Sequence, residues 1–167
     1  MNNSAEERSM NIFRYIKALF YIGDVEAFWI ARDIIVSQPK KSHIFMKLLC
    51  KVVNKHYCSS IPISSKVNEF NTVHGFCGIF ISTAAVIGKN CTIFQHVTLG
   101  SNYLDGPKMG GGAPVIGDNC FIGVGAKIIG KVKVGNNVRI GAGAIVVEDV
   151  PENCTVVMDK PRVICRG

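Results

Sequence analysis

The chain has 167 residues, enough for one compact domain with a small appendage, and its 48% hydrophobic content is sufficient to fill a core. The net charge of +7 favours polyanionic partners. Aromatic residues do not alternate with the basic ones as an RNA-binding surface requires, so we expect no nucleic-acid partner. Seven cysteines without a recognisable signal peptide do not indicate a disulfide framework, and no cysteine spacing predicts a metal site.

The first 58 residues are predicted to form a cap of three helices. Apolar residues at helical spacing place the first helix over 11–22. Asp24 is suited to cap a second helix that runs to about Val36, with Phe28 and Trp29 on its apolar side. Together these segments predict helices that bury one face.

Ser42 is suited to cap the third helix, which combines an apolar stripe with a basic face. The stripe consists of Ile44, Leu48, Leu49, Val52 and Val53, and the basic face of Lys47, Lys51 and Lys55. Charged side chains interrupt every window of twenty residues, so no membrane-spanning helix is expected. We interpret 1–58 as a cap packed on the rest of the chain or on a neighbouring subunit. The alternative is a peripheral membrane contact through the apolar and basic faces.

From Val86 to Asp149 the chain repeats every six residues. The aliphatic positions are Ile87, Ile93 and Leu99 and then, after an interruption, Ile116, Ile122, Ile128, Val134, Ile140 and Val146. The fourth position after the aliphatic residue is small or β-branched, as in Cys91, Val97, Cys120, Ala126, Val132, Val138 and Ala144. A fixed period of six is typical of a hexapeptide β-helix, in which each repeat supplies one short strand and one tight corner.

The β-helix is expected over 59–157. The same period, with weaker patterning, relates Ile61, Val67, Val73 and Ile79 at its start. Residues 101–113 leave the register and are predicted to form a glycine-rich loop inserted between two coils. Residues 158–167 form a basic C-terminal tail.

Three segments carry a resemblance to a known family: 78–100, 114–157 and the closing Lys160–Ile164. They resemble the hexapeptide-repeat acyltransferases, and within that superfamily the serine acetyltransferase branch. The closest likeness is to short members that acetylate bacterial surface polysaccharides, such as the colanic acid acetyltransferase. The resemblance implies a left-handed parallel β-helix, a homotrimer, a cytoplasmic location and acetyl-CoA as the acyl donor, with no metal. A left-handed β-helix would depart from the usual right-handed crossover rule.

Transfer of an acetyl group to a hydroxyl needs a general base, and histidine suits that role because its pKa lies near working pH. His74 resembles the catalytic histidine of the family, although an ungapped alignment places it one position early. Gln95 matches a residue that the family commonly has, and His96 stands where the family often has Ser or Gly. Gln95 and His96 are therefore candidates for catalytic residues beside His74. The alternative for His96 is an outward residue near a subunit contact.

The resemblance also implies a coenzyme A groove between subunits. Backbone groups near Val124 and Ala142 match positions that contact the pantetheine arm in relatives. Arg162 matches an arginine near the coenzyme A phosphates, and Lys160 and Arg166 are placed to assist it. The alternative interpretation of these basic residues is a solvated tail.

Two departures bear on the acceptor. Ser60 stands where serine-using members have an aspartate, and Ala113 stands where they have a second histidine. These departures favour a sugar hydroxyl of a surface polysaccharide or its precursor as the acceptor. The first alternative is serine O-acetylation for cysteine biosynthesis. The second is a catalytically silent scaffold subunit.

Overall fold

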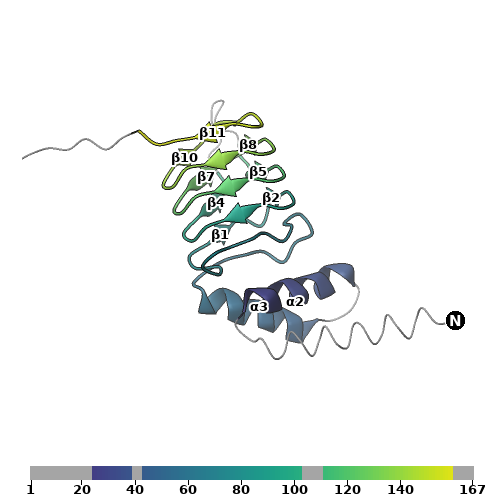
Figure 1. The fold of residues 1–167 in the computed structure, drawn as a ribbon. Coiled ribbons are helices and arrows are strands. Elements are labelled where there is room, and N and C mark those ends of the chain that lie inside the picture. The colour runs from purple at the N-terminus through teal and green to yellow at the C-terminus, as the bar shows by residue number, and fades with distance from the viewer. Residues whose placement is uncertain (1–23, 39–42, 103–110, 160–167) are drawn as a thin grey trace, which may run out of the picture.

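The structure, a computed structural model, describes residues 24–38, 43–102 and 111–159. Short strands wind into a stack of three-sided coils, and two helices lie below the first coil (Figure 1). The helices are α2 (Val25–Ser37) and α3 (Ile44–His56). The strands are β1 (Phe80–Ile81), β2 (Val86–Ile87), β3 (Thr92–Ile93), β4 (Thr98–Gly100), β5 (Val115–Ile116), β6 (Phe121–Ile122), β7 (Lys127–Ile129), β8 (Lys133–Val134), β9 (Arg139–Ile140), β10 (Ile145–Val146) and β11 (Thr155–Val156).

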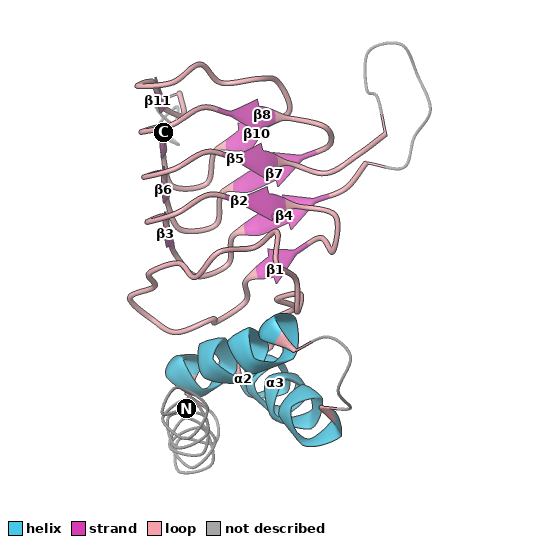
Figure 2. Cartoon of the chain, turned by 90° about the vertical axis from the view of Figure 1, so that its right-hand side faces the viewer, coloured by secondary structure: helices cyan, strands magenta, loops and turns pink. Residues whose placement is uncertain are grey.

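Three parallel sheets form the sides of the coils, in the strand orders β1-β4-β7-β10, β2-β5-β8 and β3-β6-β9-β11 (Figure 2). Each strand pairs with the strand one coil away, so equivalent repeat positions lie directly above one another. The expected left-handed parallel β-helix with N-terminal helices is confirmed. Among the described residues, no helix is both long and apolar enough to cross a membrane.

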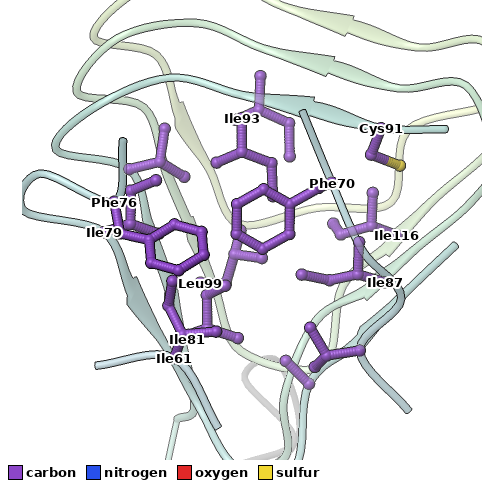
Figure 3. Packing of buried hydrophobic residues seen from close by; sticks show 14 of the residues in the cluster. Ile61, Phe70, Phe76, Ile79, Ile81, Ile87, Cys91, Ile93, Leu99 and Ile116 are labelled. Atoms are coloured by element: carbon purple, nitrogen blue, oxygen red, sulfur yellow. The ribbon is translucent and has the colours of Figure 1, made fainter. Parts of the chain in front are cut away.

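The interior is a stack of aliphatic side chains, as the six-residue period predicts (Figure 3). Ile81, Leu99, Ile128 and Val146 form one such column, and each is at most 5% exposed. The predicted small positions are buried as well: Cys91, Val97, Cys120, Ala126, Val132, Val138 and Ala144. The prediction for Val73 is wrong. Its side chain is 64% exposed, and Phe70 and Phe76 fill the interior of the first coil instead.

Asparagine occupies one recurring corner of the coils. Asn90, Asn119, Asn137 and Asn153 all have positive φ, between 55° and 60°, a backbone region that asparagine tolerates better than most residues. The side-chain amide of Asn90 donates to Asn119 Oδ1 over 2.9 Å, and that of Asn137 donates to Asn153 Oδ1 over 3.0 Å. These bonds link successive coils.

Helix α2 closes the first coil with an aromatic cluster. The rings of Phe28 and Trp29 pack edge-on against Phe76, with centroids 5.2 and 5.6 Å apart, and Trp29 packs the same way against Phe70. Such pairs contribute about 0.5–1.5 kcal/mol each beyond the apolar area that they bury. Asp24 stands at the N-cap of α2 but makes no side-chain capping bond.

A buried arginine joins α2 to the first coil. The guanidinium of Arg32 donates to the carbonyl oxygens of Ser64, at 2.7 Å, and Val67. It also pairs with Asp33 over 2.7 Å. The helix is therefore tied to the β-helix by polar as well as aromatic contacts.

Helix α3 buries only part of the expected apolar stripe. Met46, Leu49, Cys50 and Val53 are buried, whereas three residues of the predicted stripe, Ile44, Leu48 and Val52, are 76%, 54% and 41% exposed. Leu49 and Val53, the other two residues of the predicted stripe, are buried as expected, so the buried face of α3 overlaps the predicted one in part. Both Ser42 and the helix expected over 11–22 lie outside the described residues.

Candidate active site

His74 lies in a local insertion of the first coil. The pairs Asn71–Thr92 and Phe80–Thr98 align this coil with the next one. Nine positions separate Asn71 from Phe80, but six separate Thr92 from Thr98, so the lower coil holds three extra residues here. The period of six therefore does not hold in the segment that carries His74.

The loop that carries His74 is held from both sides. Phe76 is fully buried in the aromatic cluster, and Thr72 Oγ1 donates to the Gly75 carbonyl over 2.5 Å. Gly75 has a φ of +62°, and the ring of Tyr57 covers it. The Tyr57 carbonyl accepts the Gly78 N–H over 3.0 Å. His74 itself is exposed, so a well-anchored loop presents its imidazole to solvent.

A cavity of about 380 Å³ lies beside this loop. Thr72 and Gly75, which flank His74, line it together with Glu69, Tyr57 and residues from the start of α2. Across the described ranges no hydrogen bond joins Glu69 to His74. Glu69 therefore shares a cavity wall with the loop without orienting its imidazole.

The structure brings four of the predicted site residues together at one corner of the coils. By strand register, Cys77, Gln95, Val124 and Ala142 form one vertical column, here called the groove column. Gly78, His96, Gly125 and Gly143 follow them in a second column, here called the corner column. Above the first coil, the backbone N–H of each corner-column residue donates to the carbonyl oxygen of the groove-column residue one coil below. The N–H of Gly125 donates to Gln95 O at 3.0 Å, and that of Gly143 donates to Val124 O at 2.8 Å.

Gln95 brings an unsatisfied group to the groove column. Its Oε1 atom is buried and has no hydrogen-bond partner among the described residues. Buried acceptors are nearly always paired, so this oxygen is suited to accept a hydrogen bond from a ligand. Val124 and Ala142, above it, are exposed and offer their backbone to the same groove.

Other predicted residues are not brought to this corner. Lys160, Arg162 and Arg166 lie outside the described residues. Ser60 is exposed and pairs with Phe80, and Ala113 is half-buried beside the base of the inserted loop, which the Asn102–Gly112 pair closes. Within the described ranges, no three His, Cys, Asp or Glu side chains are grouped to hold a metal ion.

Two of the buried cysteines, Cys50 and Cys91, are packing residues rather than nucleophiles. Cys91 and Cys120 stack on successive coils and donate to the carbonyl oxygens of Gly117 and Gly135, at 3.2 and 3.1 Å. The hydrogen bond to Cys120, followed by burial, raises the pKa of the Cys91 thiol. Burial also raises the pKa of Cys50 to about 12. Because the thiolate is the nucleophile, neither Cys50 nor Cys91 is reactive at neutral pH.

Tyr57, Phe76 and Gly78, which hold the His74 loop, were not predicted from the sequence. One signal was available: Phe70 and Phe76 stand between the aliphatic positions Val67, Val73 and Ile79, although those positions keep the period of six. Large aromatic residues at these points are a departure from the repeat. This departure does not indicate which side chains support the coil.

Comparison with known proteins agrees with the fold. The family described as "Bacterial transferase hexapeptide (six repeats)" matches residues 113–147. A serine acetyltransferase of Bacillus licheniformis is 32% identical over 154 residues, covering 92% of this chain and 69% of the relative. One of Synechococcus elongatus is 45% identical over 94 residues, covering 56% of this chain and 37% of the relative.

Solved structures give the same result. Serine acetyltransferase isoform 3 of Entamoeba histolytica, in complex with cysteine, superimposes with a TM-score of 0.67 at 28% identity, covering 86% of this chain and 50% of that one. The Neisseria gonorrhoeae enzyme, in complex with serine, gives 0.64 at 29% identity, with 88% and 60% coverage. The chain thus spans between about a third and two thirds of the proteins that it matches.

These relatives overturn one prediction. A place among the polysaccharide-modifying members was expected from the likeness to short members of the family, and the changes at Ser60 and Ala113 favoured a polysaccharide acceptor, but the matched proteins are serine acetyltransferases. Two substitutions were too few to assign a subfamily. The expected class, an acetyl-CoA-dependent acyltransferase, is confirmed at the level of family. With about a third of its residues identical to the Bacillus enzyme over nearly its whole length, the chain belongs to the serine acetyltransferase family.

Proposed function

We propose that the chain transfers the acetyl group of acetyl-CoA to the hydroxyl of L-serine, in the cytoplasm, where acetyl-CoA is supplied. The observation that carries this proposal is the corner where the His74 loop meets the two columns that contain Gln95, His96, Val124 and Ala142. The family membership of the chain supports the choice of acceptor. The Neisseria relative, solved with serine, supports it further.

His74 is assigned the role of general base. Its imidazole takes the proton of the serine hydroxyl as that oxygen attacks the thioester carbon. The C–O bond forms and the C–S bond breaks. The imidazolium then returns the proton to the departing thiolate. No acyl-enzyme forms, which agrees with the buried, protonated state of Cys50 and Cys91.

The groove column is assigned to the acyl donor. The pantetheine arm carries amide N–H groups, which suit the unpaired Oε1 of Gln95, and the exposed backbone near Val124 and Ala142 can pair with its other polar groups. Lys160, Arg162 and Arg166 stay predicted contacts for the coenzyme A phosphates, because guanidinium and phosphate pair strongly.

The acceptor side lacks two groups that serine-using relatives have, at Ser60 and Ala113. Serine carries an ammonium group, which calls for a carboxylate. We assign this role to Glu69, because it lines the cavity that Thr72 and Gly75 share with it.

The test is release of coenzyme A from acetyl-CoA with L-serine as the acceptor. The wild-type chain is expected to turn over, and His74→Asn to lose about 10²–10⁴-fold in kcat, the usual contribution of a general base. Glu69→Gln is expected to raise KM for serine more than it lowers kcat. Lys55→Asn, at an exposed position of α3, is the control and should keep the wild-type kcat. A folded wild-type chain that releases no coenzyme A with serine would make the proposal wrong.

We also propose that the chain is a homotrimer. Exposed apolar side chains on the outer faces of the β-helix support a subunit contact: Phe80, Val115, Phe121, Val124, Ile145 and Val147, between 39% and 63% exposed. Light scattering after gel filtration should give three times the chain mass of 18.2 kDa. A monomeric mass would refute the assembly.

A peripheral membrane contact is a separate proposal. It is supported by the exposed apolar side chains of α3, Ile44, Phe45 and Leu48, beside the exposed Lys47 and Lys51. Co-sedimentation with vesicles of anionic phospholipid at low salt tests it, and Leu48→Ser should reduce the bound fraction. Equal recovery with and without vesicles would reject the contact.

A further inference from the structure

The corner column contains one residue that breaks its pattern. Gly78, His96, Gly125 and Gly143 have φ values of +63°, +61°, +69° and +69°, so all four adopt the left-handed conformation. Three are glycines, for which that conformation is free of strain. His96 adopts it with a side chain attached, at a cost of about 1–2 kcal/mol. Strain of this kind is a reason to look for a function.

The imidazole of His96 reaches toward the coil that carries His74. A Cβ placed on Gly78 would collide with the His96 ring, meeting Cε1 at 2.9 Å. By contrast, a Cβ on Gly125 or Gly143 would meet nothing within 4 Å. The ring thus lies against Gly78, four residues after His74. Its nitrogens have no hydrogen-bond partner among the described residues.

The backbone donors of this corner are already in use. The N–H of Gly78 donates to Tyr57 O at 3.0 Å, and the N–H of His96 donates to Cys77 O at 2.9 Å. The N–H groups of Gly125 and Gly143 are bonded in the same way. A negative oxygen that develops at this corner therefore needs a donor other than these four backbone groups. The ring N–H of His96 is a side-chain donor there that has no partner in the part of the chain that the structure describes.

We propose that His96 is a second catalytic residue, whose ring N–H donates to the carbonyl oxygen of the thioester as that carbon becomes tetrahedral. This inference rests on the proposed acyl transfer. As the serine oxygen bonds to the carbon, the carbonyl electron pair moves to the oxygen, which His96 stabilises without giving up its proton. When the C–S bond breaks, the carbonyl re-forms and the thiolate takes the proton held by His74. Donors aimed at such an oxygen are worth about 10²–10³-fold in kcat.

Two variants distinguish the effect of removing the imidazole ring from the effect of a changed backbone conformation at position 96. His96→Gly gives the corner column the glycine found at its other three positions, and His96→Asn uses a residue that has positive φ at four other positions within 24–38, 43–102 and 111–159. Both are expected to fold with a melting temperature equal to or above that of the wild type. Both should lose about 10²-fold in kcat, with KM for acetyl-CoA within about twofold, because the bond forms chiefly in the transition state. Added imidazole should restore part of the activity of His96→Gly.

Retention of more than a third of the wild-type kcat by a folded His96→Gly would overturn the inference, and so would a loss that appears only as a raised KM for acetyl-CoA. If the wild-type chain does not acetylate serine, the proposed function fails. The rate of acetyl-CoA hydrolysis by water, which attacks the same carbonyl, is then compared between the wild type and His96→Gly. An unchanged hydrolysis rate in His96→Gly would overturn the role of His96 independently of the acceptor.

Discussion

The ring of Tyr57, at the C-terminal end of α3, covers Gly75, the residue that follows His74. A Cβ on Gly75 would lie 2.5 Å from Cε1 and 2.8 Å from Cζ of that ring. The ring cannot move freely, because it packs against Phe76 and His56 with centroids 6.0 and 4.9 Å away. The helical cap thus controls the position of the loop that presents the candidate base.

Gly75→Ala is therefore expected to damage both stability and activity. It adds a strained φ of +62° and a collision with Tyr57, so we expect a loss of about 2–4 kcal/mol in the free energy of unfolding. Gly143→Ala is the matched stability control, because it has a φ of +69° but open space around its Cβ. Urea unfolding and coenzyme A release measure the two effects. Equal stability of the two variants, with full activity in Gly75→Ala, would contradict this account.

Replacement of Arg32 by Met should loosen the junction between α2 and the first coil. The carbonyl groups of Ser64 and Val67 would lose their donor, and a buried unsatisfied acceptor costs about 1–3 kcal/mol. We expect a total loss of about 2–5 kcal/mol by urea unfolding. Asp33→Asn, which leaves the two carbonyl contacts of Arg32 in place and neutralises its ion-pair partner, should cost less than Arg32→Met. If the two variants were equally stable, the carbonyl contacts would not hold the junction.

The thiol of Cys50 should make stability fall at alkaline pH. Burial raises its pKa to about 12 in the folded chain, against an ordinary value of 9.0. Above pH 9 the unfolded chain releases this proton while the folded chain retains it, so its contribution is present below pH 9 and is lost as pH rises toward 12. Between pH 8 and pH 10 the wild type should lose about 1 kcal/mol more than Cys50→Ala. Parallel stability curves for the two proteins would show that Cys50 does not titrate in this way.

The asparagine corner gives a prediction remote from the site. Asn119→Ala loses the bond from Asn90 and places a Cβ at a φ of 58° without a compensating side chain. Asn119→Gly loses the same bond but no longer strains the backbone. We expect the free energy of unfolding to be highest for the wild type, lower for Asn119→Gly and lowest for Asn119→Ala, with about 1 kcal/mol between the two variants. The reverse order of Gly and Ala in urea unfolding would exclude backbone strain as the cause. Both variants should keep wild-type kcat.

The β-helix was predictable because its core depends on local spacing. Each strand contributes one inward aliphatic side chain, and the next identical position lies directly above it, as in Leu99 and Ile128. Sequence period and spatial stacking are therefore the same property. Val73 was misplaced because the period holds only where coils have equal length, and the first coil carries three extra residues.

The candidate site depended on contacts that no spacing encodes. The sequence by itself determined the stack of six-residue coils, because that follows from the repeats. Its resemblance to a known family gave the acyltransferase class and His74 as the candidate base. Only the tertiary structure decided that Tyr57 and Phe76 hold the loop of His74, that α3 exposes Ile44 and Leu48, and that the ring of His96 lies on Gly78. The physical reason is that each of these contacts joins different helices or coils, whose relative height and rotation are set by packing.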